Sequence, residues 1–316
     1  MAFLTSPVTV AVPATSANLG PGFDSLGVAL ALHDEVTATV TGDQVRVGVS
    51  GQGAGELPGD ERHLVAATML ATFGRLGGRP PGFELACVNR IPQARGLGSS
   101  SAAIVAGILL ARSLVPGGAD RLGQAGVIRL AAEIEGHPDN VAPCVLGGFS
   151  IAWTAAAGQA GDGAHAVALD SAAGVMPVVF VPAQRGYTAH ARAALPASVP
   201  LADAAFNVAR AALLVRALTG APELLLAATE DRIHQDYRAP AMPDTARLVA
   251  GLRSAGIAAV VSGSGPSVLA LVPDSQPLVT AARRACPDGW SARQLPVAGG
   301  AHVLPASGGA GRAAVR

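Results

Sequence analysis

The sequence contains no lysine: all 22 of its basic residues are arginine, and 22 acidic residues balance them. The absence of lysine excludes Schiff-base chemistry, a lysine general base and the lysine of a Walker-type phosphate loop. A phosphate or carboxylate must therefore be bound by arginine, backbone N–H groups, hydroxyls or a metal ion. A formal net charge of zero leaves no basic surplus for nucleic acid or an anionic membrane, so we expect neither as a partner.

Aromatic residues and cysteines are also scarce. Aromatics make up 3% of a chain that is 50% hydrophobic, so the core must be aliphatic. The three cysteines, Cys87, Cys144 and Cys286, fit neither a disulfide framework nor a zinc site, which favours a reducing, cytoplasmic location. The N-terminal residues lack the basic region of a signal peptide. The longest uncharged runs, Val141–Gly161 and Ser254–Pro273, contain Gly, Pro, Ser or Thr and do not resemble membrane spans.

With 316 residues, the chain is long enough for two domains. Strands and helices are mixed along the chain, which predicts the α+β class with mixed sheets. The glycine-containing turn Gly158–Gly163 is a candidate joint between domains. Strands are predicted at Val8–Val12, Val28–Leu32, Val36–Thr41, Val45–Val49, Phe83–Val88, Phe149–Trp153, Met176–Val181 and Ala258–Val261. Helices are predicted at Leu64–Leu76, Ala102–Leu114, Leu122–Glu135, Leu201–Leu218, Pro222–Asp231 and Thr245–Ala255, with a short one within Asn140–Gly148.

The densest glycine and serine stretch of the first half leads directly into a predicted apolar helix. Gly96 and Gly98 allow positive φ and a close backbone approach. Ser99 to Ser101 then open the helix with free N–H groups and hydroxyls, which is a favourable place for an anion. The GK[ST] ending of a Walker A loop is absent. A serine-capped tight turn would share these features, but three serines before an apolar helix favour a phosphate-binding loop.

Two further glycine-containing motifs follow predicted strands. Ser262–Ser267 reads SGSGPS, and Pro13–Asp24 places Asn18 and Asp24 on a tight loop after the first strand. Each motif taken alone is equally well explained as an ordinary turn.

Together, and in this order, the three motifs resemble the GHMP kinase superfamily, which includes galactokinases, homoserine kinases, mevalonate kinases and phosphomevalonate kinases. Within it, the stretches PATSANLGPGFDSLG from Pro13 and EGHPDNVAP from Glu135 are similar to the homoserine kinase family. The resemblance covers nearly the whole chain. It implies two α+β domains: residues 1–165, like the second domain of ribosomal protein S5, and residues 166–302, which are ferredoxin-like. Residues 303–316 would be a flexible tail.

The resemblance implies ATP-dependent phosphorylation of L-homoserine to O-phospho-L-homoserine, a step of threonine biosynthesis. The hydroxyl would attack the γ-phosphate of Mg-ATP in line, in a cleft between the domains. A homodimer is a candidate state, because such kinases are commonly dimeric. The alternatives are another kinase of the superfamily, acting on a mevalonate-like or sugar alcohol, and a nucleotide-binding relative that has lost turnover.

Homoserine carries a carboxylate, an ammonium group and a hydroxyl, so its site needs arginine, an acid and neutral hydrogen-bonding groups. The resemblance assigns these contacts to Asn18, Asp24, Asn140, Arg192 and Arg238. Arg192 lies in a T-x-x-A-R-x-x-L-P stretch and Arg238 ends a D-x-I-H-x-x-x-R stretch. Two arginines can clamp one carboxylate, although either alone would ordinarily lie at the surface.

The resemblance also assigns the nucleotide and the metal ion. It gives ATP contacts to Pro92, Gln93, Ala94, Arg95, Gly96, Leu97, Gly98, Ser99, Ser100, Ser101 and Ala102. It makes Glu135 the Mg²⁺ ligand, with the hydroxyl of Ser99 or Ser100 alongside. It gives supporting roles to Ser262, Gly263, Ser264 and Gly265. The catalytic set is then Glu135, Asn140 and Asp24, with Asp24 assigned to substrate binding because an ionised aspartate is a weak base toward an alcohol.

Four neighbouring residues leave alternatives open. His137 is expected to make a structural or substrate-directed hydrogen bond rather than act as a base. Asp139 could be a second carboxylate behind the site or a polar cap. Arg95 could touch phosphate or face solvent. His63 stands where similar kinases often have asparagine near the adenine, so the base pocket stays open.

Overall fold

The computed structural model describes residues 2–156, 158, 161–170, 174–186, 188–273 and 275–305, without the side chains of residues 188–190. Most of the predicted tail, residues 306–316, lies outside the described residues. The first tail residue, Val303, pairs with Val10 at a sheet edge.

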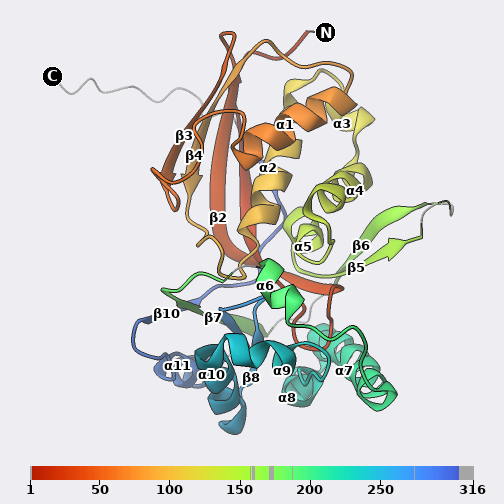
Figure 1. Cartoon of the computed structure of the whole chain (residues 1–316), viewed down its shortest axis with the longest axis vertical. Coiled ribbons are helices and arrows are strands. Elements are labelled where there is room, and N and C mark those ends of the chain that lie inside the picture. The colour runs from red at the N-terminus through yellow and green to blue at the C-terminus, as the bar shows by residue number, and fades with distance from the viewer. Residues whose placement is uncertain are drawn as a thin grey trace.

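The N-terminal half is a mixed sheet with helices packed on one face (Figure 1). In the described part of the chain, seven strands form it in the order β11-β1-β2-β4-β3, and β5 joins β2 to β6. The β3–β4 pair is parallel and the other pairs are antiparallel. The strands are β1 (Val8–Ala17), β2 (Leu26–Val40), β3 (Val45–Gly51), β4 (Phe83–Asn89), β5 (Phe149–Ala155), β6 (Gly163–Leu169) and β11 (His302–Val303). The helices are α1 (Leu64–Arg75), α2 (Ser99–Leu114), α3 (Gly118–Arg121), α4 (Gln124–Glu135) and α5 (Val141–Leu146).

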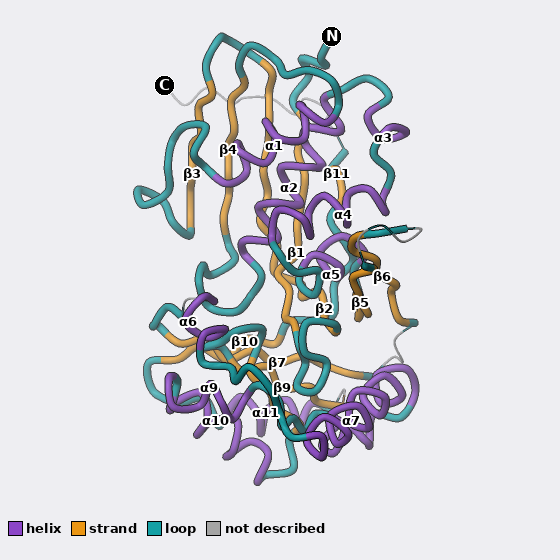
Figure 2. The backbone as a smooth tube through the Cα atoms, turned by 45° about the vertical axis from the view of Figure 1, so that its right-hand side comes forward, coloured by secondary structure: helices purple, strands orange, loops and turns teal. Residues whose placement is uncertain are grey.

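The C-terminal half is an antiparallel sheet of four described strands in the order β10-β7-β9-β8. Most of its helices lie on the side away from the first sheet (Figure 2), and α6 (Thr188–Ala193) lies at the junction of the halves. The strands are β7 (Val175–Pro182), β8 (Ala258–Val261), β9 (Val268–Pro273) and β10 (Trp290–Gln294). The other helices are α7 (Leu201–Gly220), α8 (Leu225–Ala228), α9 (Gln235–Arg238), α10 (Pro243–Ser254) and α11 (Gln276–Arg284), with short 3₁₀ turns η1 (Pro222–Leu224) and η2 (Ala239–Ala241).

A single hydrophobic cluster joins the two halves. Alternate residues of the second sheet point to opposite faces. Val179 and Leu269 belong to the large cluster that fills the first half, whereas Val178 and Ala270 pack in a smaller cluster under α10 and α11. Continuous apolar packing therefore holds the two halves together and fixes how the residues at their junction lie relative to one another.

The α+β prediction and most element positions are confirmed, with several differences. The two strands predicted at Val28–Leu32 and Val36–Thr41 are one strand, β2. The polar interruption does not break it, because the buried Asp34 carboxylate accepts a hydrogen bond from the Ile91 N–H at 2.8 Å. The helix predicted at Pro222–Asp231 is wrong beyond Ala228. Elements that were not predicted are β6, β9, β10, β11, α3, α6, α9, α11 and η2.

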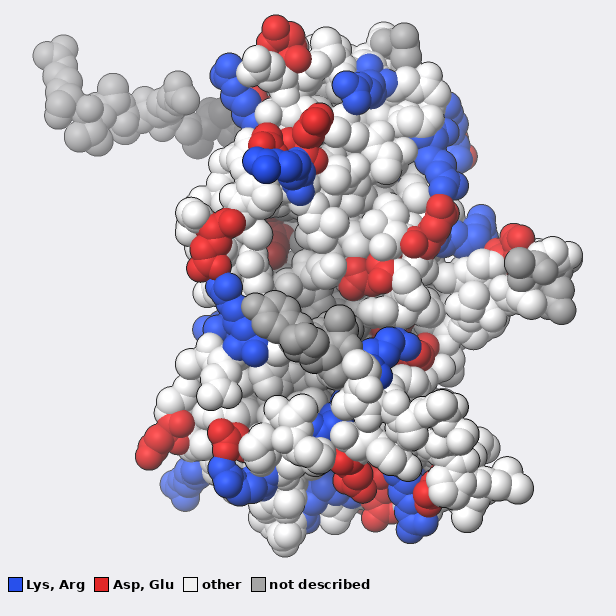
Figure 3. All heavy atoms as spheres, in the orientation of Figure 1, with Lys and Arg blue, Asp and Glu red and all other residues white. Residues whose placement is uncertain are grey.

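The predicted joint Gly158–Gly163 connects β5 and β6 of the first sheet, and only part of it lies within the described residues. The chain passes to the second sheet between Leu169 and Val175. Within the described ranges, no helix is long and apolar enough to cross a membrane. Acidic and basic side chains are interspersed on the face shown in Figure 3.

Candidate active site

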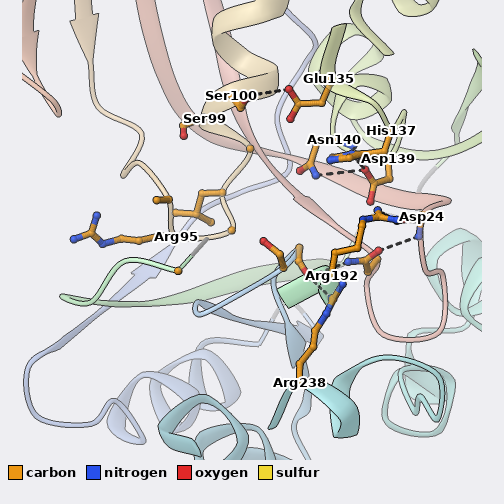
Figure 4. Close-up of a pocket in the computed structure, with 18 residues that line it drawn as sticks. Asp24, Arg95, Ser99, Ser100, Glu135, His137, Asp139, Asn140, Arg192 and Arg238 are labelled. Atoms are coloured by element: carbon orange, nitrogen blue, oxygen red, sulfur yellow. Dashed lines mark hydrogen bonds and ion pairs between the residues drawn. The ribbon is translucent and has the colours of Figure 1, made fainter. Parts of the chain in front are cut away.

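A cavity of about 260 Å³ lies between the halves and gathers residues from all three sequence motifs (Figure 4). Its lining residues are Asn18, Asp24, Ala94, Arg95, Gly96, Leu97, Gly98, Ser99, Ser100, Glu135, His137, Asp139, Asn140, Gly186, Arg192, Arg238, Gly263 and Ser264. Every residue predicted to bind homoserine is among them. Predicted residues outside this lining are Pro92, Gln93, Ser101, Ala102, Ser262 and Gly265.

The glycine loop before α2 is packed too closely for any other residue at two positions. Gly96 and Gly98 have φ of +69° and +67°. A Cβ at Gly96 would lie 2.2 Å from the Ser262 carbonyl oxygen, and one at Gly98 would lie 1.9 Å from Thr15 Oγ1. The Ser262 hydroxyl donates to the Gly96 carbonyl oxygen at 2.6 Å. The SGSGPS motif therefore packs directly against the first loop, and its supporting role in ATP binding stays a prediction.

Arg95 makes contacts within the protein that the sequence did not reveal. Its guanidinium donates hydrogen bonds to the carbonyl oxygens of Gln93, Pro182 and Ala183, at 2.9, 3.0 and 2.6 Å. The same two segments are joined by the Gly186 N–H, which donates to the Ala94 carbonyl oxygen at 2.7 Å. Arg95 therefore fastens the glycine loop to the end of β7, and its contact with ATP stays a prediction.

Glu135 lies where α4 ends, facing the N-terminus of α2. Its carboxylate accepts hydrogen bonds from the hydroxyls of Ser100 at 2.8 Å and Ser101 at 3.0 Å. A carboxylate is disfavoured at a helix C-terminus, and the facing N-terminus of α2 offsets this. Ser99, the other predicted partner, lines the cavity. The contact to Ser101 was not predicted, because the sequence does not give the rotation of α2 relative to α4.

Asp24 and Arg192 pair across the cavity. Arg192 Nη2 and Nη1 lie 2.8 and 3.1 Å from the two carboxylate oxygens of Asp24, a bidentate ion pair. Asn18 supports the same loop: its Oδ1 accepts the Asp24 N–H at 3.0 Å, and its Nδ2 donates to the Gly263 carbonyl oxygen at 2.9 Å. Both ends of the Asn18 amide are thus engaged within the protein, and its contact with homoserine stays a prediction.

Arg238 is buried beside this pair, with 3% of its surface exposed. Its Nε donates to the Ala191 carbonyl oxygen at 3.2 Å, and its Nη1 lies 3.1 Å from Nδ1 of the fully buried His234. Burial, followed by the charge of Arg192, lowers the pKa of Arg238. The ring of Phe23 lies 5.6 Å from the Arg238 guanidinium and 5.8 Å from that of Arg192. Both arginines line the same cavity, and their binding of one carboxylate stays a prediction. His234 was not singled out in the sequence.

The Glu135–Pro143 segment contains a buried carboxylate, Asp139. Its Oδ1 lies 2.6 Å from His137 Nδ1 and accepts the Asn140 N–H at 2.9 Å. The hydrogen bond to Asp139 raises the pKa of His137 despite burial. His137 therefore has the hydrogen-bonding role expected from the sequence, and Asp139 both caps the backbone and supports the site. Asn140 Oδ1 accepts from Thr15 Oγ1 at 2.8 Å, a contact that the sequence did not reveal.

A second cavity of about 210 Å³ adjoins the first and shares Ser99 and Ser100 with it. Its lining is mostly apolar and consists of Val12, Asp34, Val36, Leu57, His63, Leu64, Val65, Asn89, Gln93, Ser99, Ser100, Ala102, Ala103 and Ala106. His63 Nδ1 accepts the Val65 N–H at 3.3 Å and caps α1. Its buried Nε2 has no hydrogen-bond partner in the described part of the chain. Burial lowers the pKa of His63, so the ring is neutral near neutral pH and Nε2 carries the hydrogen.

The chain matches two family models. The model described as the GHMP kinases N terminal domain matches residues 63–148, and the one described as GHMP kinases C terminal matches residues 209–290. Similar curated proteins include homoserine kinase from Streptomyces avermitilis, 52% identical over 96% of this chain and 98% of that protein. Homoserine kinase from Streptomyces coelicolor is 54% identical over 85% of this chain and 86% of that protein.

Solved structures of related proteins have the same fold as this chain. The crystal structure of homoserine kinase from Cytophaga hutchinsonii superposes with a TM-score of 0.81 at 28% identity, over 94% of this chain and 97% of that one. Mevalonate diphosphate decarboxylase from Staphylococcus aureus superposes with a TM-score of 0.66 at 17% identity, over 95% and 98%. The second likeness concerns the fold alone.

Proposed function

Because this chain belongs to the homoserine kinase family of the GHMP kinases, we infer that it phosphorylates the hydroxyl group of L-homoserine with ATP. The product is O-phospho-L-homoserine. One observation carries the inference: a single cavity joins a phosphate-type glycine loop, the Glu135 carboxylate and a charged cluster of Asp24, Arg192 and Arg238.

The nucleotide spans both cavities. Its triphosphate lies at the N-terminus of α2, where the N–H groups and the helix dipole favour anions. Its base occupies the second cavity, because Ser99 and Ser100 line both cavities and connect them. The unpartnered Nε2 of His63 donates a hydrogen bond to a ring nitrogen of the base.

The metal site is formed around Glu135. A carboxylate oxygen of Glu135 and the Ser100 hydroxyl are hard oxygen ligands of the kind Mg²⁺ prefers, and these two residues would hold the ion. No group of three or more histidine, cysteine or acidic side chains that could hold a metal occurs among the described residues. When bound, Mg²⁺ neutralises charge on the phosphates.

The amino-acid end of homoserine exchanges partners with the protein. Its carboxylate binds Arg192 and Arg238, and its ammonium group binds Asp24, so one internal ion pair is replaced by two. Asn140 binds the hydroxyl at the far end, close to Glu135 and the phosphate loop. A mevalonate-like acceptor carries no ammonium group and would leave Asp24 uncompensated, which favours homoserine.

Phosphoryl transfer is catalysed by positioning and charge neutralisation. The reaction passes through a loose transition state with little bond formation to the attacking oxygen, so a strong base is not required. Asp24 is engaged with Arg192, so we assign it to binding. We place the reaction in the cytoplasm, in keeping with the unpaired thiols of Cys87, Cys144 and Cys286.

The test is ADP release by the purified protein with Mg-ATP, comparing L-homoserine, mevalonate, galactose and no acceptor. Turnover on homoserine alone, abolished by EDTA, is expected. Turnover on another acceptor would keep the kinase but overturn the substrate. ATP binding without turnover on any acceptor would identify a nucleotide-binding relative.

A further inference from the structure

Thr15 contacts both the phosphate loop and Asn140. It is on β1 and fully buried. Its N–H donates to the Leu97 carbonyl oxygen of the phosphate loop at 3.1 Å. Its hydroxyl donates to Asn140 Oδ1 at 2.8 Å. The Cβ position of Gly98 lies 1.9 Å from that hydroxyl and 3.1 Å from Asn140 Oδ1, so the loop covers both atoms on the remaining side.

The two ends of the Asn140 side chain have distinct partners. Nδ2 is directed at Asp139 Oδ1, 3.5 Å away (Figure 4). Asp139 Oδ1 also accepts the Asn140 N–H, and an ionised carboxylate only accepts hydrogen bonds. Rotating the amide by 180° would place Oδ1 against the carboxylate and Nδ2 against the Thr15 hydroxyl. An ionised carboxylate repels Oδ1, whereas the Thr15 hydroxyl can donate or accept. Asp139 therefore selects the amide orientation, and the Thr15 hydroxyl donates to the Oδ1 that this orientation presents.

We propose that Thr15 is a positioning residue that holds the Asn140 amide in the orientation selected by Asp139, so that an N–H faces the acceptor hydroxyl. Nδ2 has two hydrogens: one is directed at Asp139, and the other remains for the cavity. Oδ1 is held away from the cavity by Thr15 and covered by Gly98. Asn140 consequently donates to the attacking oxygen and does not take up its proton. This proposal rests on the role of Asn140 given above.

The experiment compares steady-state kinetics of Thr15→Val and Thr15→Ser. Valine removes the donor and keeps the branched shape, so kcat should fall roughly tenfold, the size expected for one misdirected hydrogen bond. The KM for ATP should change less than about twofold, because the phosphate loop keeps its backbone contacts. Serine retains the hydroxyl and should stay within about threefold of the parent. If the Thr15→Val variant does not fold, Thr15→Ala removes the same donor, and the same fall in kcat is expected.

A double-mutant cycle with Asn140→Ala shows whether Thr15 acts through Asn140. In that background, Thr15→Val should lower kcat by less than about twofold. The matched control is Thr9→Val on the same strand, which removes a hydroxyl lying 2.8 Å from Thr37 Oγ1, far from the cavity. It should leave kcat unchanged.

The failures are distinguishable. Equal losses in Thr15→Val and Thr15→Ser, or an undiminished loss in the Asn140→Ala background, would show that Thr15 acts by packing and would overturn the proposal. Parental kcat in Thr15→Val would overturn it as well. Normal turnover in Asn140→Ala itself would instead remove the role of Asn140 on which the proposal rests.

Discussion

Asp24→Asn should weaken the preference of the enzyme for an amino acid over a simple hydroxy acid as the acceptor. The substitution removes one negative charge and little volume. Asp24 has φ of +53°, a conformation that asparagine tolerates, and the bond from its N–H to Asn18 Oδ1 does not involve its side chain. The fold around the loop should therefore persist, and the kinetic change should report on charge.

The magnitude follows from two contributions. The bond between the substrate ammonium and Asp24 is charge-assisted and contributes about 1.5–3 kcal/mol. Opening the half-exposed Asp24–Arg192 pair costs about 0.2–1 kcal/mol. In Asp24→Asn, homoserine no longer gains the bond from its ammonium group to Asp24, and it no longer has to open the Asp24–Arg192 pair. 4-Hydroxybutyrate has the carboxylate and the hydroxyl but no ammonium group, so for this acceptor only the cost of opening the Asp24–Arg192 pair disappears. The pair-opening cost cancels in the ratio of the two kcat/KM values, so that ratio should fall roughly 10- to 150-fold.

The assay is ADP release with each acceptor at saturating Mg-ATP. A control for the loss of an aspartate charge is Asp203→Asn, which breaks a single 3.4 Å contact with Arg232 outside the cavity lining. The control should leave the ratio unchanged. An unchanged ratio in Asp24→Asn would refute the assignment of the ammonium group to Asp24. A large, equal fall in kcat for both acceptors would instead identify Asp24 as a proton acceptor.

Three further changes test the rest of the site. His63→Ala should raise the KM for ATP roughly 3- to 10-fold and leave that for homoserine unchanged, because it removes one hydrogen bond to the base; a fall in melting temperature alone would reduce His63 to a helix cap. Glu135→Gln should lower kcat by about 100-fold or more and shift the Mg²⁺ titration of activity to higher concentration, since an anionic ligand is lost; an unshifted titration would place the metal elsewhere. The His137–Asp139 hydrogen bond raises the folded-state pKa of His137 above its ordinary 6.5. Its contribution to stability is therefore complete below pH 6.5 and is lost as the pH rises through the raised value. Urea unfolding of His137→Asn and the parent should differ more at pH 5.5 than at pH 8.5, and a difference that grows with pH would contradict this.

Local chemistry explains which parts of the site were predictable. The phosphate loop was visible because its glycines, its serines and the helix they open are adjacent in the sequence. The contact between Glu135 and Ser101 was not, because three consecutive serines point in three directions around a helix. Which hydroxyl meets the carboxylate depends on how α2 and α4 pack, and that is decided by apolar residues far from the motif.

Long-range pairs were not derivable from the residues. Asp24 and Arg192 are 168 positions apart, and only the resemblance to a family brought them together. The same limit affected the fold. The polar residues near Asp34 interrupt the apolar pattern of β2, yet the strand continues because Ile91, on a distant segment, supplies a hydrogen-bond donor to the buried carboxylate. The hydrophobic pattern of a sequence indicates the apolar face of an element, but it does not indicate the distant partner that stabilises a buried polar residue.

The charged side chains of the cavity already have partners within the protein, and this limits how a ligand can bind there. Asp24 is neutralised by Arg192, Asp139 holds His137, and Glu135 accepts bonds from serine hydroxyls. A ligand must therefore exchange these contacts for equivalent ones, and gains only the difference between them. A ligand that offers both charges at the right spacing replaces both contacts, whereas one that offers a single charge leaves the other charged side chain without its partner. The enzyme thus discriminates between amino acids and hydroxy acids because only an amino acid gives Asp24 a new partner when Arg192 binds the carboxylate. Asp24→Asn removes the charge that needs this partner and should therefore reduce the discrimination.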